Sequence, residues 1–288
     1  MKKPGREAGW IVFFIGPSLA GFSIFYVIPF LMSIFSSFIK SPFNREFAGL
    51  SNYIALIGNP MFRRALWNTL LFTGLAVPLC VILSLFLALL MNKAVFKRRV
   101  FRTLLITPLV CPTASVVIVW QILFKRYGLV NSLLASLGLQ TQLTDWLNSG
   151  YAVLVVLLLF LWKNLGYNMI LFLAGLNSIP REYYDVAQSF GAGSLFIFFR
   201  ITLVYLGPTS FFVIILSIIN SFKIFREVFL LTGYYPDKHL YMIQHYINNC
   251  FTKLDMQKLS SASIIFSIFI FIVVYLLFRR NQTRLNNE

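Results

Sequence analysis

The stretch that decides the fold runs from Ile179 to Pro208 and reads IPREYYDVAQSFGAGSLFIFFRITLVYLGP. It lies between two long apolar runs, and we interpret it as a short surface helix followed by a return into a membrane. Pro180 can open the helix, because a proline in the first turn gives up no helical hydrogen bond. Glu182 and Asp185 fall in the opening turns, where carboxylates interact favourably with the positive end of the helix dipole.

Small residues follow on the same helix. Gly191 lies four positions after Ala187, and Ala192 follows it directly. These small residues leave one face open to a close-fitting partner. The alternative is an amphipathic helix lying on lipid headgroups. Such helices carry Lys or Arg on the polar face, whereas the core from Glu182 to Gly193 carries neither. The residues alone leave both interpretations open.

The composition requires a membrane. The chain has 288 residues, of which 58% are hydrophobic and 12% are charged. A soluble domain carries roughly twice that charged fraction. The net charge of +16 does not indicate nucleic-acid binding, because the basic residues cluster between the apolar runs, as in the loops that hold a membrane protein in place.

Six apolar segments are long enough to cross about 30 Å of hydrocarbon, which takes about 20 helical residues. They should be helices, because only helices and closed barrels satisfy the backbone in lipid. We predict an all-α integral membrane protein in which residues 10–278 form one six-helix domain, with short termini at 1–9 and 279–288. The predicted spans are Trp10–Ile39, Asn68–Met91, Thr103–Phe124, Tyr151–Gly175, Tyr205–Phe222 and Ser260–Phe278.

Lys and Arg in the loops set the orientation. An even number of spans places both termini on one side of the membrane. The loop Asn92–Arg102 lies on that side and holds five basic residues and no acid. We therefore expect both termini and the segment Ile179–Pro208 to be cytoplasmic.

That segment resembles the coupling segment of ABC-importer permeases. The pattern of that segment is Glu-Ala-Ala, followed after three residues by Gly and after nine more by Ile-x-Leu-Pro. Here Asp185-Val186-Ala187 takes the place of the triplet, Gly191 follows after three residues, and Ile201-Thr202-Leu203 follows after nine more. Val204 stands where the family prefers proline. The resemblance implies that an ATPase subunit contacts the coupling residues, Glu182, Asp185, Val186, Ala187, Gly191 and Ala192.

Other stretches resemble the carbohydrate branch of these permeases, the maltose and multiple-sugar type. They are Phe25–Pro29, Gly49–Tyr53, Ala65–Thr69, Phe101–Leu105, Gly128–Asn131 and Leu173–Leu176. The resemblance implies a type I importer fold in a bacterial cell membrane and an oligosaccharide substrate. It also implies a second, homologous permease as heterodimer partner, two cytoplasmic ATPase subunits that bind ATP and Mg²⁺, and an extracytoplasmic substrate-binding protein. A glycerol-phosphate or polyol permease is the alternative within the branch.

The sequence carries no catalytic motif. It has no Gly-x-x-x-x-Gly-Lys-Ser/Thr phosphate loop and no His-Glu-x-x-His, so we expect neither an enzyme nor a bound cofactor. The three cysteines have unrelated spacings, and His239 and His245 lie in a polar loop, so no metal site is expected. All nine acids lie outside the predicted spans, which argues against an ATP-independent secondary transporter, because such carriers need acids or histidines within the membrane.

Few polar residues interrupt the predicted spans. Those in the fourth and fifth spans should face the bundle interior or a wet cavity, where amides and hydroxyls suit a sugar. Hydrogen bonding between helices explains the same residues equally well. The substrate-pathway candidates are Asn164, Asn168, Ser217 and Asn220. The role of Lys163 stays open, with a structural ion pair as one reading, and Tyr234 and Tyr235 are either a partner or sugar surface or an interfacial tyrosine belt.

Overall fold

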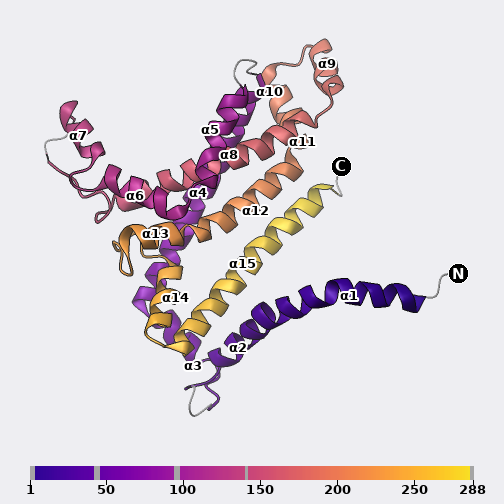
Figure 1. Cartoon of the computed structure of the whole chain (residues 1–288). Coiled ribbons are helices and arrows are strands. Elements are labelled where there is room, and N and C mark those ends of the chain that lie inside the picture. Colours follow the sequence, from indigo (N-terminus) through magenta and orange to yellow (C-terminus); the bar gives the residue numbers. More distant parts are fainter. Residues whose placement is uncertain (1–3, 42–45, 94–97, 140–141, 286–288) are drawn as a thin grey trace. The chain divides into compact units, whose positions relative to one another are not determined.

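The computed structural model describes residues 4–41, 46–93, 98–139 and 142–285 (Figure 1). In these ranges the regular structure is helical, apart from a bridge between Ile39 and Phe47. Parts of the predicted termini (1–3 and 286–288) and of the predicted basic loop (94–97) lie outside them. The chain divides into two compact units, which are described separately below. One comprises Met1–Arg63 and Ile247–Phe271, and the other Arg64–Tyr246 and Ile272–Glu288.

The first unit begins with one long apolar helix. α1 (Pro4–Phe22), the π-helical turn η1 (Ser23–Val27) and α2 (Ile28–Ser37) follow each other without a break. Pro29 lies in the first turn of α2 and has no N–H to donate, which accounts for the wider π turn just before it. Phe13–Ser37 is long and apolar enough to span a membrane, as predicted for the first span.

The end of α2 is fixed by α3 (Ser51–Gly58). Asn52 Nδ2 donates to the carbonyls of Ser37 and Ile39, both at 2.9 Å. The buried Ser37 hydroxyl also lies 2.6 Å from the Tyr53 hydroxyl. α14 (Ile243–Thr252) and α15 (Met256–Leu285) contribute to both units. Met256–Arg279 forms a candidate span that contains the predicted sixth one.

In the second unit, α4 (Pro60–Lys93) and α8 (Ala152–Asn177) confirm the predicted second and fourth spans as helices. The predicted third span, Thr103–Phe124, is not one helix. It is split at Cys111–Pro112 into α5 (Arg98–Val110) and α6 (Thr113–Phe124), and α7 (Leu129–Ser136) follows. Proline lacks the N–H that would continue a helix and disfavours helical geometry in the residue before it. The apolar candidate span here is Thr113–Ser136.

The segment after α8 is also divided. It comprises α9 (Arg181–Ser189), α10 (Ser194–Ile197), η2 (Phe198–Thr202), α11 (Leu203–Tyr205), α12 (Gly207–Lys223) and α13 (Phe225–Thr232). The predicted fifth span, Tyr205–Phe222, belongs to a longer pair, Ser194–Tyr205 and Gly207–Thr232, with a bend of 68° between them. The described residues thus contain five candidate spans, or six if this bent pair is one span.

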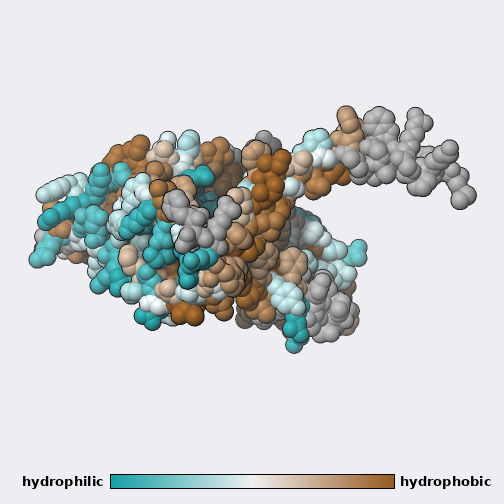
Figure 2. Space-filling model, turned by 90° about the horizontal axis from the view of Figure 1, so that it is seen from below, coloured by the Kyte–Doolittle hydropathy of each residue, from teal (hydrophilic) through white to brown (hydrophobic). Residues whose placement is uncertain are grey.

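The chain exposes apolar side chains as a membrane protein does. Figure 2 shows hydrophobic residues in brown over wide areas of the face in view. On α4 the exposed residues recur at helical spacing, so they form one apolar stripe along the helix. They are Trp67, Leu71, Leu75, Ile82, Phe86 and Leu90.

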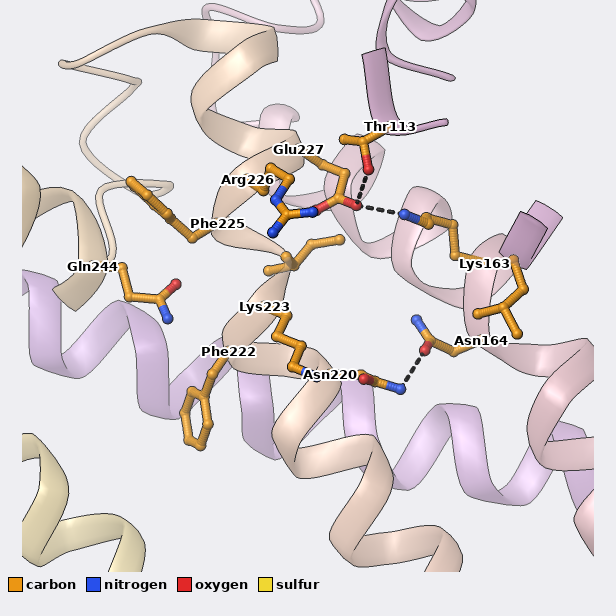
Figure 3. Close-up of a pocket in the computed structure, with 12 residues that line it drawn as sticks. Thr113, Lys163, Asn164, Asn220, Phe222, Lys223, Phe225, Arg226, Glu227 and Gln244 are labelled. Carbon is orange, nitrogen blue, oxygen red and sulfur yellow. Dashed lines mark hydrogen bonds and ion pairs between the residues drawn. The ribbon is translucent and has the colours of Figure 1, made fainter. Parts of the chain in front are cut away.

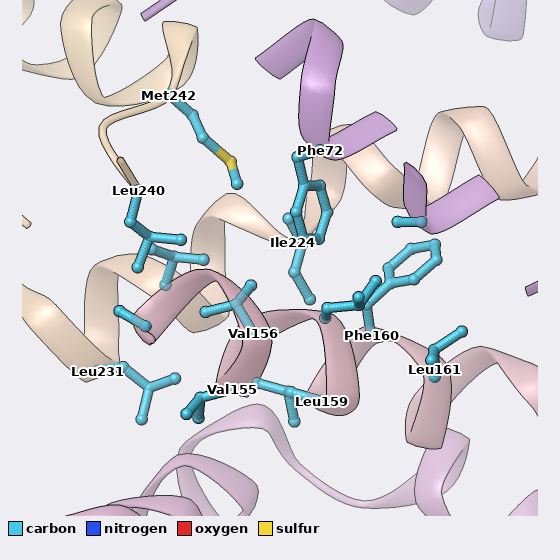
Figure 4. Packing of buried hydrophobic residues seen from close by; sticks show 14 of the residues in the cluster. Phe72, Val155, Val156, Leu159, Phe160, Leu161, Ile224, Leu231, Leu240 and Met242 are labelled. Atoms are coloured by element: carbon cyan, nitrogen blue, oxygen red, sulfur yellow. The ribbon is translucent and has the colours of Figure 1, made fainter. Parts of the chain in front are cut away.

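α8 is the central helix of the second unit. In its first half, Val155, Val156, Leu159 and Phe160 are buried against α4, α6 and α13 (Figure 4). The rings of Phe160 and of Phe72 on α4 lie 5.9 Å apart, edge to face. Its second half packs on α12 through a second buried cluster, which contains Met169, Phe172, Leu173, Leu176, Leu206 and Val213.

A glycine lets α5 approach α8 closely. A Cβ built on Gly166 would lie 1.7 Å from the carbonyl oxygen of Leu105. No side chain can occupy that space, so this contact between two backbones requires glycine. Small residues serve this purpose where membrane helices pack tightly.

Candidate functional site

A cleft of about 470 Å³ lies in the second unit, where α8 meets the junction of α12 and α13. Its volume falls within the range of about 300–1,000 Å³ that small-molecule sites occupy. Figure 3 shows polar side chains from several helices around it. They include Thr113, Lys163, Asn164, Asn220, Glu227 and Gln244.

Two predicted pathway residues meet in this cleft. Asn220 Nδ2 donates to Asn164 Oδ1 at 2.9 Å, and Asn164 Nδ2 donates to the Phe160 carbonyl at 2.8 Å (Figure 3). Asn164 is therefore held in place on α8, one turn after Phe160. The pair joins α8 to α12 through a single amide–amide hydrogen bond.

An ion pair lies beside these amides. Lys163 Nζ is 2.5 Å from Glu227 Oε1, and Thr113 Oγ1 donates to the same oxygen at 3.4 Å. The Lys163 and Glu227 side chains are only 15% and 7% exposed. The interpretation of Lys163 as an ion-pair partner is therefore confirmed, and the pair connects α8 with α13.

Glu227 itself was missed by the sequence reasoning. The sequence places every acid outside the six predicted spans, but Gly207–Thr232, the second member of the bent pair that forms a candidate span, includes Glu227. The apolar run Val228–Leu231 directly after Glu227 is the signal that could have found it. The argument against a secondary transporter from the absence of intramembrane acids therefore fails on this point, although this acid is already paired with a lysine.

Two further cations line the cleft. Lys223 ends α12 and Arg226 lies in the first turn of α13, and both are exposed. Neither has a carboxylate within ion-pair distance among the residues that the structure describes. Because Lys163 is neutralised by Glu227, the cleft has two positive charges in excess.

The other two predicted pathway residues do not line the cleft. Asn168 Nδ2 donates to Ser217 Oγ at 2.8 Å and to Cys80 Sγ at 3.4 Å. Asn168, Ser217 and Cys80 are all fully buried, so they join α8, α12 and α4 in the helix packing. The structure thus separates the four candidates into a cleft pair and a packing pair.

The predicted coupling residues lie on and just after α9. Glu182, Asp185, Val186 and Gly191 are exposed, while Ala187 and Ala192 are half-buried. Two contacts hold α9 on the chain that follows. The Tyr184 hydroxyl lies 3.2 Å from Thr202 Oγ1, and the rings of Tyr183 and Tyr205 are 4.9 Å apart. These contacts hold α9 in position, while the acidic side chains of Glu182 and Asp185 on its surface remain exposed.

Gly191 has a backbone role that its small size did not predict. Its φ is +75°, a left-handed conformation that ends α9. The Gly191 N–H donates to the Gln188 carbonyl at 2.9 Å, and the Ala192 N–H donates to the Ala187 carbonyl at 3.0 Å. This pattern is a Schellman motif, in which glycine avoids the strain of positive φ.

The remaining polar residues form no metal centre. No group of three or more His, Cys, Asp or Glu is placed to hold a metal ion among the described residues. His245 does not lie in a polar loop, as the sequence predicted, but on α14. It is fully buried, accepts from the Met242 N–H at 3.3 Å, and packs edge to face on Phe225 at 4.8 Å. Burial disfavours its charged form and lowers its pKa to about 4.

Comparison with known proteins agrees with this architecture. The arabinooligosaccharides transport system permease protein AraP of Bacillus subtilis is 34% identical over 223 residues, covering 76% of this chain and 70% of that protein. The sn-glycerol-3-phosphate transport system permease protein UgpA of Yersinia enterocolitica is 30% identical over 284 residues and 96% of each chain.

A solved structure has the same fold. It is the crystal structure of a bacterial ABC transporter involved in the import of the acidic polysaccharide alginate, with a TM-score of 0.82, 22% identity and 96% of each chain covered. The fold is therefore the type I importer permease fold predicted above. The family described as the binding-protein-dependent transport system inner membrane component matches residues 80–287. The chain belongs to this family of inner-membrane transport components.

Proposed function

We propose that this chain is the membrane-spanning subunit of an ATP-driven importer for a carbohydrate. The observation that carries this proposal is the Asn164–Asn220 pair in the cleft. Asn164 lies on α8, which runs without a break to Asn177, just before α9. Amide groups at such a site suit a hydroxyl-rich ligand. The relatives are named for the transport of arabinooligosaccharides and of sn-glycerol-3-phosphate, so they support a sugar or polyol but leave its charge open.

The proposed assembly contains a second, homologous permease, an extracytoplasmic binding protein and two cytoplasmic ATPase subunits that carry ATP and Mg²⁺. This chain contributes half of the pathway and no ATP site, since its sequence has no phosphate loop. Both termini and α9 are cytoplasmic in this proposal, on the side of the basic loop Asn92–Arg102. The exposed Glu182 and Asp185 would then meet the ATPase.

The chain performs no covalent chemistry in this mechanism. A ligand shifts a conformational equilibrium only by its different affinity for the two states. In the cleft, a sugar hydroxyl that donates to Asn164 Oδ1 competes with Asn220 Nδ2 for the same acceptor. Substrate would thereby replace one of the hydrogen bonds between α8 and α12, while the buried Asn168–Ser217 bond would remain.

The test is ATP-dependent uptake by the complete complex in liposomes. Asn164→Ala removes the acceptor for the sugar hydroxyl and should lower uptake about tenfold, the effect of losing about 1.4 kcal/mol of hydrogen bonding. Asn148→Ala removes an exposed amide outside the cleft and should transport normally. Both variants should retain basal ATP hydrolysis, which shows an intact assembly. Uptake by this chain alone without ATP would refute the proposal and support a secondary carrier.

A further inference from the structure

The charge of the cleft indicates the charge of the substrate, which neither the fold nor the family determines. We propose that the cleft binds a carbohydrate that carries an anionic group, and that Lys223 and Arg226 bind that group. This inference rests on the proposed import function. It follows from which charges in the cleft are already paired and which are not.

Lys163 is not available to a ligand as a free cation. It is 15% exposed and its Nζ contacts Glu227 Oε1, whose carboxylate is 7% exposed. The two charges cancel, and the Thr113 hydroxyl adds a hydrogen bond to the same oxygen. The pair forms a neutral part of the cleft wall between α8 and α13.

Lys223 and Arg226 line the part of the cleft that is formed by the junction of α12 and α13, where they lie three residues apart. Figure 3 shows both beside the cleft, with Arg226 next to Glu227 and Lys223 near Asn220. They belong to the bent pair that is a candidate membrane span. Unpaired cations are costly in such segments and usually face a wet cavity that serves an ion or a substrate.

The position of Arg226 at the start of α13 also favours an anionic ligand. Lys223 stands in the last turn of α12, where the negative end of the helix dipole favours a cation, so local structure alone accounts for it. Arg226 stands in the first turn of α13, where the dipole disfavours a cation. Helix stability therefore does not explain Arg226, whereas an anionic ligand does.

The neighbouring groups suit the remainder of a sugar. Asn220 and the half-buried Gln244 line the same cleft and offer amide groups to hydroxyls. A guanidinium can bind a phosphate, sulfonate or carboxylate group through two parallel hydrogen bonds, and the lysine adds a point charge. The cleft thus combines an anion site with neutral polar groups within one volume of about 470 Å³.

The experiment compares charged and neutral probes on the complete transporter. The probes are sn-glycerol 3-phosphate against glycerol, and trigalacturonate against galactotriose. Binding to the detergent-purified complex is measured by equilibrium dialysis at low and high salt. We expect at least one anionic probe to bind about tenfold or more tightly than its neutral partner, with an affinity that falls as salt rises.

Variants then assign the preference to residues. Lys223→Gln and Arg226→Gln should each lower the affinity for that anionic probe about tenfold and leave the neutral probe unchanged. Arg226→Lys should restore part of the loss, because it keeps the charge but not the paired hydrogen bonds. The control Lys238→Gln removes an exposed loop cation outside the cleft and should change nothing.

Two results would overturn the inference. One is ATP-dependent uptake of a neutral sugar with no preference for the anionic probe of either pair, which would leave the proposed import function intact. The other is loss of the second permease subunit from the Lys223→Gln or Arg226→Gln complex with unchanged probe preference, which would assign these cations to a subunit interface. Failure of all ATP-dependent uptake would instead refute the import function itself.

Discussion

Replacing Glu227 by glutamine removes the carboxylate that neutralises Lys163. The two side chains are 7% and 15% exposed, so little water is present to replace the lost partner. Removing one member of a buried pair costs about 3–5 kcal/mol, because the other charge is left uncompensated. For a domain of this size, about 1 kcal/mol corresponds to about 2–4 °C in Tm. We therefore expect Glu227→Gln to lower the Tm of the purified complex by at least about 6 °C.

The matched control removes both charges. A buried ion pair can be replaced by apolar residues at little net cost, so the double variant Lys163→Met and Glu227→Leu should recover most of the lost stability. Thermal unfolding of the wild type, Lys163→Met, Glu227→Leu and the double variant completes a double-mutant cycle. A coupling energy below about 0.5 kcal/mol would mean that the two side chains do not depend on each other, which would refute this reasoning.

Four further predictions concern other parts of the chain. Gly191→Asn should couple normally, because Asn tolerates positive φ, whereas Gly191→Trp should insert but uncouple transport from ATP hydrolysis; normal uptake by the Trp variant would count against docking. Asp185→Lys should weaken co-purification of the ATPase, and an unchanged complex would show that this carboxylate is not a contact. His245 has a pKa of about 4 in the folded chain against an ordinary 6.5, so the unfolded chain binds the extra proton between these values. Stability should then fall by about 3 kcal/mol in total as pH drops from 6.5 to 4, and His245→Gln should flatten this profile. Gly166→Ala should destabilise the protein by at least about 1–3 kcal/mol, because the new Cβ would overlap the Leu105 carbonyl oxygen, and an unchanged Tm would contradict that packing.

The sequence was sufficient for the features that depend on local composition. Long apolar runs predicted α8 to within two residues at each end, because a membrane span has to bury its whole length in lipid. α4 begins eight residues before, and α15 ends seven residues after, the predicted bounds. It did not separate Thr103–Phe124 into two helices. Pro108 and Pro112 both lie in that run, yet Pro108 is inside α5 and only Pro112 marks the break.

The candidate site was predictable only in part, for a related reason. Polar residues within apolar runs identified Asn164 and Asn220, which do meet in the cleft. The same rule selected Asn168 and Ser217, which hydrogen-bond to each other in the helix packing. Which side of a helix faces a cavity depends on partners far away in sequence, and the contact between Lys163 on α8 and Glu227 on α13 joins residues 64 positions apart.

The continuity of α8 has a mechanical consequence. Lys163 and Asn177 lie on one helix without an internal proline, and their separation along its axis is about 21 Å. A continuous helix of this kind would carry a displacement at α9 to one wall of the cleft. The opposite wall is built on the junction at Ile224, where α12 and α13 meet and bending is easier. One wall is therefore a single continuous helix and the other a helix junction, so a displacement at α9 would change the width of the cleft rather than displace the cleft as a whole.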